Sequence, residues 1–169
     1  MSAFNINLPE KYIIKKEIGS GGMARVFLCE DKELGKYVAV KVLSLDPSTP
    51  TSNQQRFKEE MRLVQYIKSP YIVKFYEGKY DKHIKYLSME YVQGKMLKEV
   101  IEMQGRLQPD RAVDFAIQIA KGFSEIHAQN IVHRDLKTSN VIITNTGQVK
   151  IIDFGIAISD DSARFTQTG

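Results

Sequence analysis

The stretch that decides this chain is His133-Arg134-Asp135-Leu136-Lys137-Thr138-Ser139-Asn140, with Asp153-Phe154-Gly155 shortly after it. Two carboxylates, one amide and one lysine lie along a passage that reads as strand, loop and strand. The apolar runs Val141-Ile142-Ile143 and Val149-Lys150-Ile151-Ile152 predict two strands between the motifs. The polar groups are the set that can hold metal ions, a nucleotide's terminal phosphate and an attacking hydroxyl in line.

Each polar residue of this passage suits one part of phosphoryl transfer. Asp135 is the candidate to accept the proton of the incoming hydroxyl, and Lys137 can stabilise the transferring group. Asn140 and Asp153 can supply oxygen ligands to magnesium, which favours oxygen and keeps several waters. Taken singly, each residue also suits a turn or a polar surface. Their combination at this spacing is what favours a catalytic site.

A glycine-rich stretch lies upstream, between two predicted strands: Gly19-Ser20-Gly21-Gly22-Met23-Ala24-Arg25-Val26. Glycines let backbone N–H groups approach phosphate oxygens, although a plain hairpin turn uses them too. A strand follows where a dinucleotide fingerprint needs a helix, and no Gly-Lys-Ser/Thr closes the stretch as in a Walker A loop. The apolar strand Val38-Ala39-Val40 then leads to Lys41, which either reaches solvent or places its charge on the inner phosphates of a nucleotide.

A buried lysine needs a counter-charge to keep its proton. The helix predicted over 53–67 offers two glutamates, Glu59 and Glu60. Glu60 lies three residues beyond Phe57, close to the apolar face, whereas Glu59 points more outward. We therefore expect Glu60 to pair with Lys41, and a plain surface glutamate is the alternative.

The period of the apolar residues changes from strand to helix near Gln93-Gly94. Before this point we expect strands at 12–18, 26–28, 37–40, 72–75 and 84–89, and one helix over 53–67 that Thr51 or Ser52 caps. After it we expect a short helix from Leu97 that Gly105 ends, and a long helix that Pro109 opens. In the long helix, one apolar stripe comprises Ala112, Phe115, Ala116, Ile119, Ala120, Phe123 and Ile126.

The bulk composition is that of a globular protein, with 43% hydrophobic and 26% charged residues. The sequence has no apolar run of about 18 residues, so we expect no membrane span within it. The N-terminus lacks the pattern of a secretory signal. The single cysteine, Cys29, excludes an internal disulfide and suits a reducing compartment, so we expect a cytoplasmic location. The net charge of +4 is mild, and we do not expect nucleic-acid binding.

Taken in order, these motifs resemble those of a eukaryote-like (Hanks-type) protein kinase from about Tyr12 to the end of the chain. The runs Gly21-Gly22-Met23-Ala24 and Asp153-Phe154-Gly155-Ile156-Ala157 are most similar to bacterial Ser/Thr members. The resemblance implies an α+β, bilobal protein-kinase fold. Residues 1–92 would form a complete N-lobe, with an antiparallel sheet and one helix, plus the hinge. Residues 93–169 would form a partial C-lobe that ends within the activation loop.

The same resemblance implies the cofactors ATP and Mg²⁺, protein Ser/Thr hydroxyls as substrate, and a role for each motif. Lys41 pairs with Glu60, Asp135 is the catalytic base with Lys137 beside it, and Asn140 and Asp153 hold magnesium. The implied nucleotide contacts are Ile18, Gly19, Ser20, Gly21, Gly22, Met23, Ala24, Arg25, Val26, Ala39, Lys41, Met89, Glu90, Val92 and Ile142. Of these, Met89 is the gatekeeper, and Glu90 and Val92 are the hinge. A regulatory hydrophobic spine would comprise Val64, Phe75, His133 and Phe154.

The chain departs from the family pattern at three points. Ala24 replaces the third glycine of the glycine-rich loop, and Thr138 stands where many members have proline. The chain also ends before the Ala-Pro-Glu motif and the substrate-docking segment. The alternative function is therefore a non-catalytic ATP-binding or interaction module. A small-molecule phosphotransferase of related fold is disfavoured by Arg134 and Lys137, which protein kinases use.

Two threonines near the end of the chain, Thr166 and Thr168, are candidate phosphorylation sites by the same resemblance. The physical reason is that Arg134 could form charge-assisted hydrogen bonds with a phosphate and order this loop. The alternative is that both are ordinary loop residues.

Overall fold

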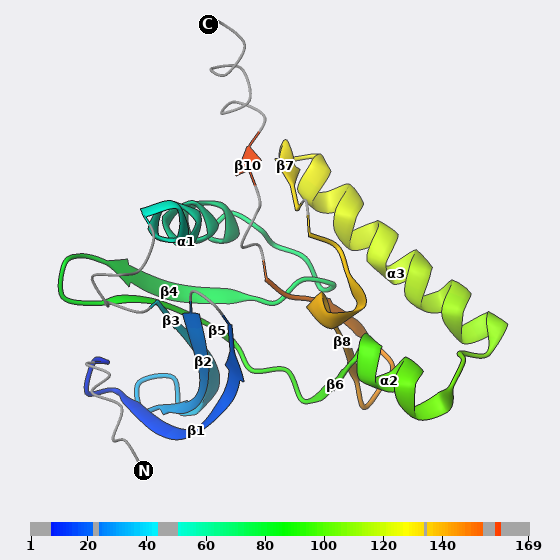
Figure 1. The fold of residues 1–169 in the computed structure, drawn as a ribbon, viewed down its shortest axis with the longest axis horizontal. Coiled ribbons are helices and arrows are strands. Elements are labelled where there is room, and N and C mark those ends of the chain that lie inside the picture. Colours follow the sequence, from blue (N-terminus) through cyan, green and yellow to red (C-terminus); the bar gives the residue numbers. More distant parts are fainter. Residues whose placement is uncertain (1–7, 22–23, 44–50, 134, 154–157, 160–169) are drawn as a thin grey trace, which may run out of the picture. The chain divides into compact units, whose positions relative to one another are not determined.

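The structure is a computed structural model that describes residues 8–21, 24–43, 51–133, 135–153 and 158–159 (Figure 1). The chain divides into two compact units. The first comprises Met1–Met61 and Phe75–Tyr91, and the second comprises Arg62–Lys74 and Val92–Gly169. Within the described residues, no helix is long and apolar enough to cross a membrane.

The first unit is an antiparallel sheet of five strands with one helix, as expected for an α+β kinase N-lobe (Figure 1). The strand order is β1-β2-β3-β5-β4. The elements are β1 (Tyr12–Ser20), β2 (Ala24–Asp31), β3 (Lys36–Leu43), α1 (Thr51–Val64), β4 (Phe75–Tyr80) and β5 (Lys85–Glu90). β3 is the central strand, because it pairs with β2 on one side and with β5 on the other.

One core of the first unit packs on the sheet through aromatic and branched side chains. Its buried members are Tyr12, Phe27, Cys29, Val38, Val40, Ile84 and Tyr86. The β-branched residues of β3 lie between two neighbouring strands, an environment that favours them. Cys29 is a free thiol inside this core, and burial raises its pKa to about 11. A thiol with so high a pKa is unreactive near neutral pH.

The structure differs from the prediction at α1 and at the strand expected over 72–75. The helix α1 begins at Thr51 and ends at Val64, so Thr51 lies within the helix and Ile67 lies beyond it. The strand predicted over 72–75 is wrong: β4 begins only at Phe75, and Ile72 forms a single parallel bridge with Ile151. Ile72 is 1% exposed. A short buried apolar run has the same composition whether or not it joins a sheet, which explains the error.

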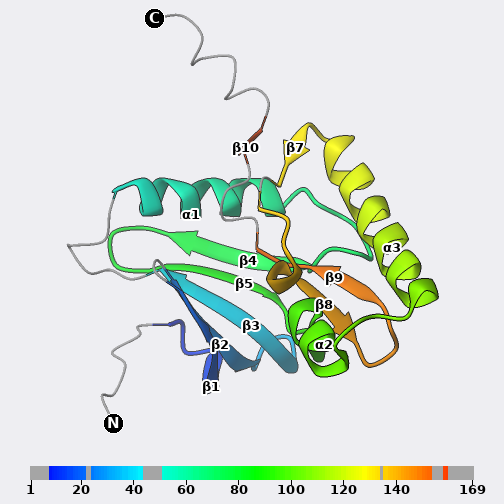
Figure 2. The same ribbon diagram turned by 45° about the vertical axis from the view of Figure 1, so that its right-hand side comes forward.

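The second unit contains two helices and short strands (Figure 2). Its helices are α2 (Leu97–Gln104) and α3 (Pro109–His127), and η1 (Thr138–Asn140) is a single 3-10 turn. Its strands are β6 (Gly94–Met96), β7 (Ile131–Val132), β8 (Val141–Thr144), β9 (Val149–Ile151) and β10 (Ile158–Ser159). A three-stranded sheet has the order β6-β8-β9, and β10 pairs with β7. Pro109 opens α3 and Gly105 follows α2 with φ 69°, both as predicted.

The long helix α3 packs along the strand that leads to Asp153. The side chain of Gln118 accepts a hydrogen bond from the backbone N–H of Val149 at 2.8 Å and donates to the carbonyl of Gly147 at 3.3 Å. The Ile151 N–H donates to the carbonyl of Tyr71 at 2.7 Å. The outward N–H groups of β9 are thus satisfied by α3 and by the segment before β4.

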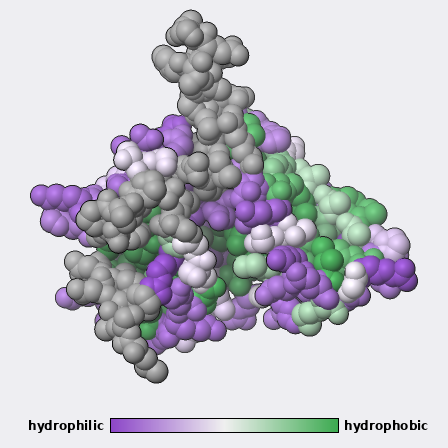
Figure 3. Space-filling model, viewed as in Figure 1, coloured by the Kyte–Doolittle hydropathy of each residue, from purple (hydrophilic) through white to green (hydrophobic). Residues whose placement is uncertain are grey.

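The predicted stripe of α3 is only partly buried. Phe115 and Ile126 are buried, whereas Ala116 and Ala120 are exposed. Val113 and Ile117 lie on the same exposed side, and Figure 3 shows this apolar surface in green over α3. The helix carries apolar residues on two faces, so a single stripe could not be assigned from the sequence.

Gly94 allows β6 to lie against β8 more closely than any other residue would. A Cβ atom at Gly94 would lie 2.3 Å from the carbonyl oxygen of Ile143, which is backbone and cannot swing away. We expect Gly94→Ala to lower the free energy of unfolding by about 1–3 kcal/mol, as overpacking does. Denaturant unfolding measures the change, and Lys95→Ala on the exposed neighbouring position is the control. Equal stabilities of the Gly94→Ala variant and the wild type would contradict the prediction.

Candidate active site

Lys41 is held inside the first unit by the strand that carries it. Four consecutive residues of β3, Val38 to Lys41, are buried, so side chains on both faces of this strand are covered. Lys41 lies opposite Val26 of β2 and Leu87 of β5. A lysine at this position cannot extend along an open edge to water, so its charge must be met within the fold.

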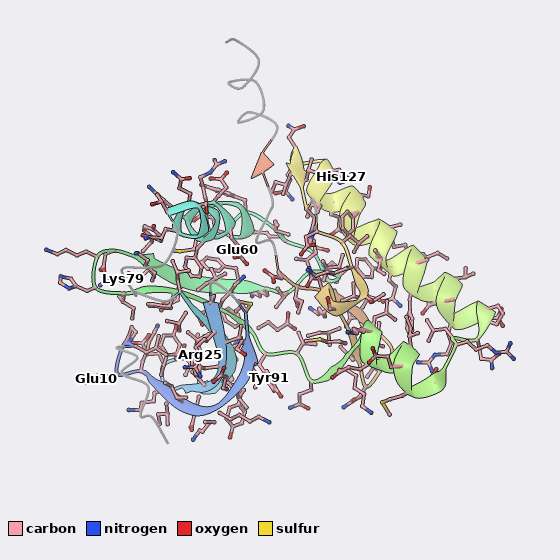
Figure 4. All side chains as sticks on the ribbon, viewed as in Figure 1. Glu10, Arg25, Glu60, Lys79, Tyr91 and His127 are labelled. Atoms are coloured by element: carbon pink, nitrogen blue, oxygen red, sulfur yellow. The ribbon has the colours of Figure 1, made fainter. Side chains whose placement is uncertain are left out.

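Glu60, which Figure 4 labels beside α1, supplies a carboxylate for that charge. The Lys41 Nζ lies 2.8 Å from both Oε1 and Oε2 of Glu60, and the two side chains are only 8% and 3% exposed. Phe57, one turn earlier on α1, is fully buried, so Glu60 lies beside the apolar face of the helix. Glu59 is half-buried. The pair therefore joins Lys41 to the glutamate that was preferred from the sequence.

The glycine-rich stretch is the hairpin turn between β1 and β2. Gly19 pairs with Val26 and Ser20 with Arg25, and the Gly21 N–H donates to the carbonyl of Ala24 at 2.9 Å. Gly22 and Met23 lie outside the described residues. The Arg25 guanidinium forms an ion pair with Glu17 of β1. The Arg25 side chain is thus held by an ion pair between β1 and β2.

The other expected nucleotide contacts fall on several strands, and the structure places each within its own unit. Met89 and Glu90 end β5, opposite Ala39 and Val38. Ile18 lies on β1 with 36% of its surface exposed. In the second unit, Val92 follows the boundary between units, and Ile142 of β8 pairs with Met96 and Lys150.

Asp135 is the centre of a hydrogen-bonded cluster in the second unit. Its Oδ2 lies 2.7 Å from Lys137 Nζ and accepts a hydrogen bond from Asn140 Nδ2 at 3.0 Å. The same Asn140 nitrogen donates to the Asp135 carbonyl at 2.8 Å. Asn140 is buried at the end of the η1 turn, which its N–H closes onto the Lys137 carbonyl at 2.9 Å. The turn η1 thus brings all three predicted side chains together.

These contacts fix the charge of the cluster. The hydrogen bond from Lys137, supported by that from Asn140, holds the pKa of Asp135 below its usual range. The same contact raises the pKa of Lys137. At neutral pH the cluster therefore contains a carboxylate and an ammonium group, and Asp135 can accept hydrogen bonds but is a weak base.

His133 supports Asp135 from beneath. It is fully buried, 5.6 Å from the ring of Phe123. The Asp135 N–H donates to His133 Nδ1 at 3.3 Å, and His133 Nε2 lies 3.4 Å from the Ile152 carbonyl. Burial lowers the pKa of His133. A neutral ring that carries its proton on Nε2 satisfies both contacts. Only packing in the spine was expected of His133, and the hydrogen bond to the Asp135 backbone was missed.

Asp153 has a left-handed backbone conformation with φ 66°, which is unusual for a residue with a side chain. Non-glycine residues in this region are concentrated at functional sites. The N–H of the preceding residue, Ile152, donates to the carbonyl of Asn140 at 2.9 Å. This hydrogen bond holds the backbone next to Asp153 close to Asn140. No sequence signal predicted this conformation.

The donor atoms at this end of the second unit suit magnesium. The Asn140 nitrogen is used by Asp135, which leaves the amide oxygen as the atom that can coordinate a cation. Asp153 supplies a carboxylate. Magnesium binds through one or two carboxylates together with phosphates and waters, so this donor set fits it. Among the described residues, no three His, Cys, Asp or Glu side chains gather as a metal cluster.

Several predicted residues cannot be placed. Arg134, Phe154, Thr166 and Thr168 lie outside the described residues, as does the side chain of Val64. Phe75 is half-buried at the start of β4. Of the expected spine, Phe75 and His133 are therefore the members whose side chains are described.

Removal of the Glu60 carboxylate takes away the group that lies 2.8 Å from the buried Lys41 Nζ. We expect Glu60→Ala to lower the free energy of unfolding by about 3–5 kcal/mol, the usual cost of breaking a buried ion pair. Glu102→Ala is the control, because Glu102 forms an exposed pair with Lys98 and should cost at most about 1 kcal/mol. Denaturant unfolding measures both losses of unfolding free energy. Similar losses in the two variants would show that the Lys41–Glu60 pair contributes no more to stability than an exposed pair.

The lowered pKa of His133 predicts a specific dependence of stability on pH. Below its ordinary pKa of about 6.5, the unfolded state binds a proton that the folded state does not, so stability falls as the pH falls. The contribution is complete above that value and is lost toward the folded-state pKa. An NMR titration should show His133 titrating below 6.5, and the acid-side loss of stability should shrink in His133→Phe. A folded-state pKa at or above that of a free histidine would refute this.

Comparison with known proteins places these features in a family. The model of the protein kinase domain matches residues 12–168. Serine/threonine-protein kinase PrkC from Bacillus subtilis is 39% identical over 158 residues, which is 94% of this chain and 24% of that protein. Serine/threonine-protein kinase PknA from Mycobacterium tuberculosis is 38% identical over 169 residues, 97% of this chain and 39% of that protein. The chain thus spans about a quarter to two fifths of these relatives, and it belongs to the protein kinase domain family.

Proposed function

We propose that this chain is the ATP- and Mg²⁺-dependent catalytic part of a protein Ser/Thr kinase, which transfers the γ-phosphoryl group of ATP to protein Ser or Thr hydroxyls. The observation that carries the proposal is the Asp135–Lys137–Asn140 cluster, with its distances of 2.7 to 3.0 Å. The names of the relatives PrkC and PknA, both serine/threonine-protein kinases, support the choice of substrate class.

In the first unit, Lys41 would bind the inner phosphates of the nucleotide. Its side-chain nitrogen is already oriented by Glu60, so phosphate binding needs no new ordering of the side chain. A charged group that is fixed before the substrate arrives contributes more to electrostatic stabilisation than one that must reorient. Glu60 acts through Lys41 and is a positioning residue.

In the second unit, Asp135 would orient the attacking hydroxyl. Because the pKa of Asp135 is lowered, it binds a proton weakly before bond making has begun. Phosphoryl transfer passes through a loose transition state, in which the hydroxyl loses its proton late. An ionised carboxylate that accepts the hydroxyl's hydrogen bond and takes the proton only at that stage fits this order of events.

Lys137 and the magnesium ligands would meet the charge on the transferring group. The Lys137 side chain is 54% exposed apart from its contact with Asp135, so its ammonium remains accessible. Asn140 and Asp153 would hold Mg²⁺, which neutralises phosphate charge when bound. Asn140 would thus bind the metal through oxygen while its nitrogen keeps Asp135 in place.

We also place this part of the protein in the cytoplasm, with proteins and no nucleic acid as partners. The free and buried Cys29 suits a reducing compartment. Exposed ion pairs such as Lys98–Glu102 distribute charge of both signs over the surface.

The substitution Asp135→Asn tests the proposed chemistry. It keeps the size of the side chain but removes the proton acceptor, so we expect phosphate transfer to fall by about 10²–10⁴-fold while the affinity for Mg·ATP stays near that of the wild type. Radiolabelled transfer to a generic protein substrate and calorimetric titration measure the two quantities. Asp110→Asn, on the exposed first turn of α3, is the control. Wild-type turnover in the Asp135→Asn variant would disprove the assigned role.

A further inference from the structure

The helix that carries Glu60 rests on β4 at two points. Phe57 of α1 lies against Tyr80, with ring centroids 6.4 Å apart. One turn further along α1, the terminal methyl of Met61 lies over Gly78. Both contacts join α1 to β4 within the first unit.

The two contacts can form together because the distance between Phe57 and Met61 along the helix is close to that between Tyr80 and Gly78 along the strand. Phe57 and Met61 are four residues apart on α1, which is about 6 Å along a helix. Tyr80 and Gly78 are two residues apart on β4, which is about 6.6 Å along a strand and returns to the same face of the sheet. The order is reversed, so α1 runs antiparallel to β4 along this contact.

Gly78 lies beside the Met61 side chain of α1 and the backbone of β5. A Cβ atom there would lie 2.8 Å from Met61 Cε and 2.9 Å from the Tyr86 carbonyl oxygen. Ordinary contacts begin near 3.4 Å, so an added methyl would displace the Met61 methyl, which is the end of a flexible side chain, and would press on the Tyr86 backbone of β5. A glycine inside a strand weakens the strand, and close approach of another element is a recognised reason for its presence.

We propose that Gly78 is a positioning residue for the Lys41–Glu60 pair, because its missing side chain leaves room for Met61 to hold α1 against the sheet. Glu60 directly precedes Met61, so a shift of the helix at Met61 moves the Glu60 carboxylate as well. The pair has both Nζ–O distances at 2.8 Å and almost no exposure to solvent. A buried ion pair depends steeply on its separation, because no water replaces a lost contact. The catalytic consequence of Gly78 rests on the proposed function, whereas its effect on the pair does not.

The test measures the pair without reference to activity. The rate at which an amine-reactive reagent modifies Lys41 is followed by mass spectrometry in the absence of nucleotide, with the exposed Lys82 as internal reference. Lys41 should be strongly protected in the wild type. Gly78→Ala should lose part of this protection, because the added methyl displaces the Met61 side chain from its contact with β4. Met61→Ala should also lose part of it, because the helix then keeps only one of its two contacts with β4, that of Phe57 with Tyr80.

The double variant Met61→Ala/Gly78→Ala distinguishes two explanations for a loss of protection in Gly78→Ala. One is disturbance of the contact between Met61 and Gly78, and the other is strain of the sheet at the Tyr86 carbonyl. An alanine methyl at 78 then fills the space that the methionine has vacated, and Lys41 should regain protection beyond the level of Met61→Ala alone. This comparison holds even where Gly78→Ala alone does not fold. The control is Lys79→Ala, the neighbouring β4 residue, whose ammonium pairs with Asp81. It should leave labelling of Lys41 unchanged.

A double variant no better protected than Met61→Ala would overturn the proposal, because the Tyr86 carbonyl would then be the only obstacle. Unchanged protection of Lys41 in Gly78→Ala would overturn it as well. The proposed function fails by a different result, namely the absence of phosphate transfer by a wild type in which Lys41 is protected.

Discussion

The buried ion pair between Lys41 and Glu60 is the interaction on which the first unit depends. A lysine at the centre of a sheet is tolerated only when its charge is met nearby, because an unpaired ammonium in a desolvated site would lose its proton. This requirement fixes one face of α1 over β3, and Phe57 and Met61 fix the same helix against β4. The glycine at 78 and the ion pair are thus two parts of one constraint on where α1 lies.

The charged groups of the second unit are held in place in a different way. They are more exposed, so mutual hydrogen bonds and backbone geometry hold them in place. The single turn η1 joins Lys137 to Asn140, and both side chains turn back to Asp135. His133 accepts a hydrogen bond from the Asp135 N–H, and the Asn140 carbonyl accepts one from the N–H of Ile152, the residue before Asp153. The chemistry proposed for this loop therefore rests on backbone contacts as much as on its named side chains.

Much of this arrangement could be predicted because the decisive residues are close in sequence or lie on periodic elements. Asp135, Lys137 and Asn140 share one loop, and Glu60 lies at a helical spacing from the apolar Phe57. The prediction of a strand over 72–75 was wrong, because a buried apolar run carries no information on its pairing partner. The positive φ of Asp153 and the close approach at Gly78 were also beyond reach. The close approach at Gly78 involves Met61 and Tyr86 on other elements, which no local pattern encodes, and no motif in the sequence marks a positive φ.

The central claim is that these charged groups serve a magnesium-bound nucleotide, and a calorimetric titration of the wild-type protein with ATP tests it most directly. The titration is made with Mg²⁺ and again with a chelator. We expect ATP to bind in both, and to bind more tightly with Mg²⁺, because Asn140 and Asp153 offer it oxygen ligands. Binding that is indifferent to Mg²⁺, or no binding at all, would contradict the claim.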